Sequence, residues 1–247
     1  MFKMGILAII GALVCGCVGV KVAKETTPKA PEGRSVYSVL RVAKANITID
    51  GRLDEPIWQK CQLLTDFSLP WEPGVTPQKT EFRAFCDAEN LYFAYKAFEE
   101  TPMIAEEWTG KTTLNKEDRV EIYFSPDWEM KLYYCIEIDP LGRVHDFRGT
   151  RPGGFDSSWT CEGLKVAATR GEEKDNRFYI VEGLIPLKTL RSWGMPENML
   201  PVGLFRADLE RTPYSRYHSH WMSWVDLRGH KVSFHMPEAL GVFEIQD

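Results

Sequence analysis

Two segments near the middle of the chain alternate apolar and polar side chains, and this pattern constrains the fold more than any other feature. In Arg119–Ser125 the apolar residues Val120, Ile122 and Phe124 alternate with polar ones, and Leu132–Asp139 repeats the alternation. Successive side chains of a β-strand point to opposite faces of the sheet, so each segment predicts a strand with one buried face.

The rest of the chain contains further short runs of strand-forming residues separated by turns. We expect strands at Thr80–Asp87, Leu91–Phe98, Trp159–Ala168, Arg177–Leu184, Gly203–Arg211, His218–Trp224 and Leu240–Ile245. One segment, Pro186–Trp193, is typical of a helix, because proline suits its first turn and Gly194 its end. Short strands without alternating helices predict an all-β fold: a single antiparallel β-sandwich, immunoglobulin- or jelly-roll-like, with one short helix.

The first residues carry the pattern of an export signal. The apolar run of residues 5–14 is too short to span a bilayer, and Gly16–Cys17 then resembles a bacterial lipobox, in which the thiol of Cys17 would receive a lipid. We expect a protein of the bacterial cell envelope, lipid-anchored at the outer membrane or cell surface, with simple secretion as the alternative. Only the anchor would contact the membrane.

These features divide the chain into three parts. Residues 1–17 form the signal, residues 18–38 are poor in large apolar side chains and predict a flexible tether, and residues 39–247 are expected to form one folded domain. The formal net charge of −5 argues against a nucleic-acid partner, and we expect a monomer. The sequence does not decide between disulfides and buried free thiols for Cys61, Cys86, Cys135 and Cys161.

Three segments, in order, resemble the family 9 carbohydrate-binding modules. The opening segment Ile47–Trp58 combines a strand end, the turn signal Asp50–Gly51 and a tryptophan. The second runs from Trp108 to Ser125, and the closing one comprises Trp221–Asp226 and Phe234–Phe243. The resemblance covers residues from about 40 to 247 and implies a non-catalytic sandwich that binds an oligo- or polysaccharide between aromatic rings, with planar polar groups reading the sugar hydroxyls.

The resemblance and the residue types together nominate a set of site residues. The family's clamp tryptophan is replaced near Asn115, so Trp108 is the upstream candidate for that wall, and Phe234 stands at the other clamp position. Period-two geometry predicts that Arg206 shares a polar strand face with Asp208 and Glu210, opposite Phe205 and Leu209. The predicted carbohydrate-binding residues are Trp108, Asn115, Arg151, Arg206, Trp224, Phe234 and His235. The resemblance also implies structural Ca²⁺, for which Asp87 and Asp118 are the candidate ligands.

Other functions remain open from the sequence. Glu121 and Glu137 on adjacent strands could serve a glycoside hydrolase, although a wet sheet face explains them equally well. A haem-binding, DOMON-like electron-transfer domain would need an axial histidine or methionine, and a structural role in a surface assembly is a third alternative. His218 and His220 are spaced to share one strand face, as a metal pair would, but the sequence suggests no third ligand nearby.

Overall fold

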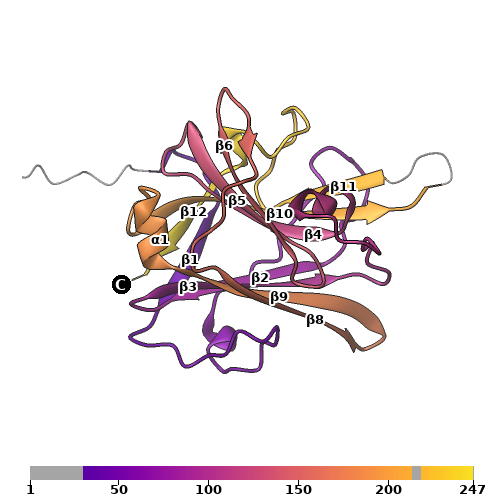
Figure 1. Ribbon diagram of the computed structural model, residues 1–247, viewed down its shortest axis with the longest axis horizontal. Coiled ribbons are helices and arrows are strands. Elements are labelled where there is room, and N and C mark those ends of the chain that lie inside the picture. Colours follow the sequence, from indigo (N-terminus) through magenta and orange to yellow (C-terminus); the bar gives the residue numbers. More distant parts are fainter. Residues whose placement is uncertain (1–29, 213–217, 247) are drawn as a thin grey trace, which may run out of the picture.

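The computed structural model describes residues 30–212 and 218–246, and most of its regular elements are β-strands (Figure 1). The strands are β1 (Val36–Arg41), β2 (Thr80–Cys86), β3 (Asn90–Phe98), β4 (Arg119–Phe124), β5 (Leu132–Ile138), β6 (Val144–Thr150), β7 (Phe155–Asp156), β8 (Lys165–Glu173), β9 (Asn176–Pro186), β10 (Met199–Glu210), β11 (His218–Ser223) and β12 (Gly241–Ile245). The helix α1 (Leu187–Ser192) lies where the sequence predicted it, and 3-10 turns occur at Trp58–Lys60, Lys111–Lys116 and Pro237–Ala239. The all-β prediction is confirmed.

The strands form one curled, mixed sheet. Their order is β7-β6-β5-β4-β10-β12-β1-β2-β3-β9-β8, with β11 paired to β10. Strand β1 pairs in parallel with β12 through its first residues and with β2 through its last ones, so it joins two layers that face one another in Figure 1. The predicted purely antiparallel pairing is therefore wrong at β1. This strand passes from one layer to the other, and its neighbour in each layer, β12 or β2, runs in the same direction as β1.

The space between the two layers holds the main hydrophobic core. Tyr37, Phe82, Tyr95 and Phe243 come from β1, β2, β3 and β12, and the ring of Phe82 lies 4.8 Å from that of Tyr95 and 5.7 Å from that of Phe243. The hydroxyl of Tyr95 also donates a hydrogen bond to the carbonyl of Glu121 on β4, at 2.8 Å. The core side chains predicted on β4 are fully buried, and the four described cysteines are buried free thiols.

The two faces of strand β10 point in the opposite directions to those predicted, so the face with Arg206 and not the face with Phe205 points into the core. Phe205 is opposite Glu121 and Arg206 is opposite Val120, so Arg206 shares the core face and Phe205 the outer one. Arg206 is wholly buried, and its guanidinium donates to the carbonyl of Phe98 and to Glu99. Both faces of β10 are covered, so its polar alternation could not show which face was solvated.

The fold begins earlier than the sequence indicated. Residues 36–38 belong to β1, so the predicted tether extends too far, and Arg34 already donates hydrogen bonds to the carbonyls of Pro237 and Leu240. Cys17 and residues 18–29 lie outside the described residues. No helix in the described ranges is long and apolar enough to cross a membrane.

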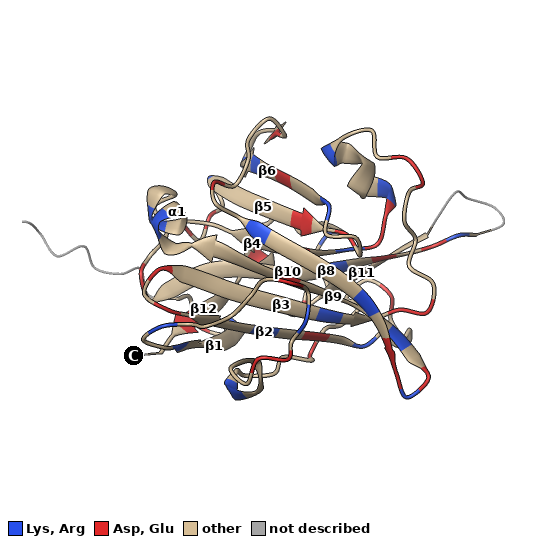
Figure 2. Cartoon of the chain, turned by 60° about the horizontal axis from the view of Figure 1, so that its bottom comes forward, with Lys and Arg blue, Asp and Glu red and all other residues tan. Residues whose placement is uncertain are grey.

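The opening segment covers the outer face of the layer made by β2, β3 and β9 (Figure 1). Trp58 is buried there in a second apolar cluster, 5.0 Å from the ring of Phe85. The turn at Asp50–Gly51 is fixed by Glu182 of β9, whose Oε2 accepts both backbone N–H groups at 3.0 and 2.9 Å. The visible part of this side of the molecule mixes acidic with basic residues (Figure 2), as in the Lys96–Glu173 ion pair.

Candidate functional site

A cleft of about 420 Å³ opens on the face of β4, β5 and β6 that points away from the core. Core residues and cleft residues alternate along β4, because side chains of a strand alternate in direction. The lining residues are Trp71, Thr112, Asn115, Arg119, Glu121, Tyr123, Glu137, His145, Phe147, Phe155, Ser157, Trp221, Val232, Ser233, Phe234 and His235. The volume lies within the range of small-molecule sites, roughly 300–1,000 Å³.

The floor of the cleft is a row of buried polar residues. Glu121, Glu137 and His145 are directly opposite one another across β4, β5 and β6. Arg119 donates from Nε to Oε1 of Glu121 at 2.8 Å and lies 3.4 Å from Oε2 of Glu137. Its Nη1 donates to the carbonyls of Leu114 and Glu117 in the loop that leads into β4. One guanidinium therefore compensates two buried carboxylates, and its other contacts hold it in place.

Each of these carboxylates also has a second partner. The hydroxyl of Tyr123 donates to Oε2 of Glu121 at 2.8 Å, and Nδ1 of His145 lies 3.1 Å from Oε2 of Glu137. Burial and the nearby charge of Glu137 raise the pKa of Glu121 to about 7, against the opposing effect of Arg119. Burial lowers the pKa of His235 to about 4, so its ring is neutral near pH 7. Within the described residues, Nε2 of His145 is a buried nitrogen without a partner.

Aromatic rings stand on both sides of this polar row. Trp221 is on β11 and Phe155 on β7, which lie on opposite sides of β4, β5 and β6 in the strand order. Phe234 packs beside Trp221 at 5.6 Å and beside Trp71 at 5.5 Å between ring centroids. On the other side Phe155 packs against His235 at 4.8 Å and is 59% exposed. The cleft thus offers apolar faces at its sides and hydrogen-bonding groups at its floor.

The structure brings three of the seven predicted binding residues to this cleft: Asn115, Phe234 and His235. Asn115 lies in the 3-10 turn before β4, and His235 stacks on Tyr123 at 5.3 Å. Phe234 stacks on Phe205 at 4.0 Å, which explains why Phe205 is buried although it faces away from the core.

The other four predicted residues do not line the cleft. Trp108 is 40% exposed and lies over the guanidinium of Arg143, and the exposed Arg151 follows the end of β6. Arg206 faces the core, as described above. Trp224 is buried against Gly241, where an added Cβ would come within 2.3 Å of its ring. Tertiary packing buries Arg206 and Trp224, whereas Trp108 and Arg151 are exposed but do not line the cleft.

Sequence reasoning missed Arg119, His145, Phe155, Trp71 and Trp221 as members of one site. A signal existed for Arg119, since the alternation that buries Val120 also sends Arg119 to the side of Glu121. Trp71 had no such signal. It reaches the cleft through long-range contacts, including a hydrogen bond from its Nε1 to the carbonyl of His230 at 3.0 Å.

The two predicted metal ligands lie in different surroundings. Asp87 closes a turn: Oδ1 accepts the N–H groups of Glu89 and Asn90, and Oδ2 accepts from the N–H of Ala45 and the hydroxyl of Tyr92. Asp118 is buried, and burial raises its pKa to about 7. It groups with Glu99 and Asp208, whose carboxylate oxygens lie within 4.8 Å of one another and of Asp118.

Comparison with known proteins assigns the chain to a family. The structure is similar to that of a Bacteroides uniformis ATCC 8492 protein to which carbohydrate binding has been provisionally ascribed, with a TM-score of 0.68 and 15% identity over 86% of this chain and 100% of the other. It is also similar to a family 9 carbohydrate-binding module from Caldicellulosiruptor kristjanssonii in complex with glucose (TM-score 0.55, 15% identity, 86% and 96% covered) and with cellotriose (0.54, 15%, 86% and 94%). Comparison with curated proteins gave no significant match. The family model described as carbohydrate family 9 binding domain-like matches residues 49–247, and the chain belongs to this family.

Proposed function

We propose that this protein binds a saccharide noncovalently in the cleft between Trp221 and Phe155. The observation that carries the proposal is the row of buried planar polar groups on the cleft floor with aromatic rings on both sides. A pyranose presents an apolar C–H face and an edge of hydroxyls, so it needs both kinds of surface.

Each floor residue has a defined part in this proposal. The carboxylates of Glu121 and Glu137 accept hydrogen bonds from sugar hydroxyls, and the guanidinium of Arg119 donates them. A hydroxyl that reached Nε2 of His145 would give a partner to a buried atom that has none. Glucose and cellotriose, the ligands of the structural neighbours, are the first sugars to test.

The proposed role includes no bond chemistry. A glycosidase needs one carboxyl free to give a proton and another free to act as nucleophile or base. Here both carboxylates contact the same guanidinium, and Glu121 also accepts the Tyr123 hydroxyl. We expect the sugar to be recovered unchanged after incubation with the protein.

Further features of the same proposal concern the whole molecule. We infer that the two facing layers act as a sandwich and that the module works as a monomer at the bacterial cell envelope, held there by a lipid on Cys17. Radiolabelled palmitate incorporated into the parent but not into Cys17→Ala tests the anchor.

If Ca²⁺ is bound, the carboxylates of Glu99, Asp118 and Asp208 fit its preference for oxygen ligands better than Asp87, whose oxygens already accept four protein hydrogen bonds.

A glycan-array screen tests the binding function. The parent is compared with Asn115→Ala and with Lys116→Ala, because both residues are exposed neighbours in one turn and only Asn115 lines the cleft. We expect capture of a saccharide by the parent and by Lys116→Ala, and weaker capture by Asn115→Ala. No capture by the parent, or equal capture by all three proteins, contradicts the proposal.

A further inference from the structure

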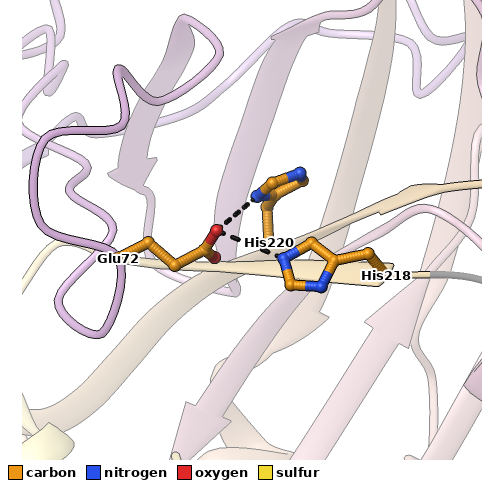
Figure 3. A group of neighbouring side chains, drawn as sticks. All are labelled: Glu72, His218 and His220. Carbon is orange, nitrogen blue, oxygen red and sulfur yellow. Dashed lines mark hydrogen bonds and ion pairs between the residues drawn. The ribbon is translucent and has the colours of Figure 1, made fainter. Parts of the chain in front are cut away.

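A second group of polar side chains lies outside the cleft lining described above. His218 and His220 project from the same face of β11, and Figure 3 shows the carboxylate of Glu72 directed at both rings. Oε2 of Glu72 lies 3.2 Å from Nε2 of His218 and 2.8 Å from Nδ1 of His220. The structure thus supplies the third ligand that the sequence did not suggest for this histidine pair.

These separations match the size of a metal site. Ligand atoms about 2.0 Å from a tetrahedral Zn²⁺ lie about 3.3 Å from one another. The two measured distances are near this value, and all three candidate ligand atoms lie within 4.8 Å of each other. Small side-chain rotations would therefore suffice to place an ion among them.

The donor set and its surroundings indicate which ions would bind. Two imidazoles and one carboxylate suit Zn²⁺ and other divalent transition metals, whereas Ca²⁺ and Mg²⁺ prefer oxygen ligands throughout. Oε2 of Glu210 lies 3.6 Å from the outer nitrogen of His220, where a second carboxylate commonly orients a metal-binding histidine. The side chains of Glu72 and His220 are about one-fifth exposed and that of His218 is half exposed, so an ion can enter from solvent.

We propose that Glu72, His218 and His220 bind one divalent transition-metal ion of the Zn²⁺ class, with a fourth position left for water. The ion would join the segment that carries Glu72 to β11, which are far apart in the sequence. Trp71 and Trp221 are the chain neighbours of Glu72 and His220, and both line the cleft. The metal would therefore hold this side of the cleft in place, although its binding does not depend on any sugar.

Calorimetric titration of the purified chain with Zn²⁺, without saccharide, tests the proposal. We expect one ion per chain for the parent and an affinity at least tenfold lower for His218→Ala, His220→Ala and Glu72→Gln. His230→Ala is the matched control, because it removes an exposed imidazole outside the group. Glu210→Gln should weaken binding about tenfold through the orientation of His220.

A Co²⁺ titration provides a second readout. Visible absorption bands without a thiolate charge-transfer band are expected for the parent, since the ligands are nitrogen and oxygen, and the bands should be lost in His220→Ala. Circular dichroism of each metal-free variant separates loss of the site from loss of the fold, and Glu72→Gln, which keeps the side chain's size, serves if an alanine variant unfolds. The proposal is overturned if the parent does not bind Zn²⁺, or if the folded His218→Ala and His220→Ala variants bind Zn²⁺ as tightly as the parent does.

Discussion

Glu121 in the cleft and Glu182 under the opening turn are both buried, and burial raises the pKa of each to about 7. Their partners differ. Glu182 accepts the backbone N–H groups of Asp50 and Gly51, so it fixes the path of the chain. Glu121 accepts from the side chains of Arg119 and Tyr123 on the cleft face.

The two glutamates therefore belong to two regions with different roles, although the family resemblance covers both. The opening segment is the most recognisable stretch of the sequence, but its turn and Trp58 serve folding. The residues proposed to meet a ligand lie on β4, β5, β6 and β11. We expect substitutions in the first region to change stability and leave saccharide affinity unchanged, and substitutions in the second to change affinity more than stability.

Gly51→Ala should have the largest effect. Gly51 has a φ of +81°, and an added Cβ would lie 2.9 Å from the backbone carbon of Ala168 and 3.0 Å from the backbone nitrogen of Thr169. Left-handed strain and a clash with backbone together should lower the free energy of unfolding by about 3 kcal/mol. Urea denaturation measures this loss.

Gly229→Ala is the control for that substitution. Its φ is similar, at +83°, but nothing lies within 4 Å of the added Cβ, so the cost should be about 1 kcal/mol. Equal losses of stability in both variants would show that the contact of the added Cβ with Ala168 and Thr169 of β8 does not contribute. Reduced saccharide affinity in folded Gly51→Ala would break the separation between the two regions.

Glu182→Gln should change how stability depends on pH. The folded-state pKa of about 7 exceeds the ordinary value of 4.5, so this group's contribution is fully present below about pH 4.5 and is lost as pH rises through 7. The shift corresponds to at most about 3 kcal/mol. Relative to Glu182→Gln, the parent should therefore lose stability between pH 5 and 8, as measured by denaturation at intervals; parallel pH profiles would contradict this.

Glu121→Gln should weaken saccharide binding about 10- to 100-fold, because the amide replaces one acceptor oxygen on the cleft floor with an NH₂ donor and leaves a hydroxyl without its partner. Arg119 keeps Glu137 as a counter-charge, so the loss of stability should be smaller than for Gly51→Ala. Glu182→Gln is the matched control, a buried glutamate outside the cleft, and should bind like the parent. Isothermal titration calorimetry with the best array ligand compares Glu121→Gln with Glu182→Gln. Equal affinities of these two variants would show that Glu121 does not contact the saccharide.

Phe155→Ala should have the smallest effect, a loss of affinity of about three- to tenfold as one aromatic contact disappears. Its side chain is largely exposed, so stability should change by no more than about 0.5 kcal/mol. Trp108→Ala removes another exposed aromatic ring that does not line the cleft and should leave affinity unchanged. A larger loss of affinity for Trp108→Ala than for Phe155→Ala would place the binding site near Trp108 and not in the cleft.

The sequence predicted the fold well where one face of a strand is clearly apolar. Val120, Ile122 and Phe124 gave β4 its correct faces, and α1 was found from Pro186 and Gly194. The prediction failed on β10 because residues on both of its faces are buried. It also missed β1, whose pairing with β12 and β2 joins segments at opposite ends of the domain.

Of the predicted carbohydrate-binding residues, the cleft contains Asn115, Phe234 and His235, to which the family resemblance pointed. The expectation that Glu121 and Glu137 lie on adjacent strands is confirmed by the pairing of β4 with β5. The rest depended on strand register and on loops that meet through space. Nothing local to Trp71 reveals that it lies beside Phe234, and nothing local to Glu72 reveals the two histidines beside it.

The most direct test of the central claim is an NMR titration that follows the indole N–H resonances, assigned by single Trp→Phe variants, as saccharide is added. Trp71 and Trp221 line the cleft, whereas Trp58 lies under the opening turn. We predict saturable shifts for Trp71 and Trp221 and none for Trp58. Unmoved resonances at Trp71 and Trp221 in the presence of a sugar that the protein binds would contradict the account.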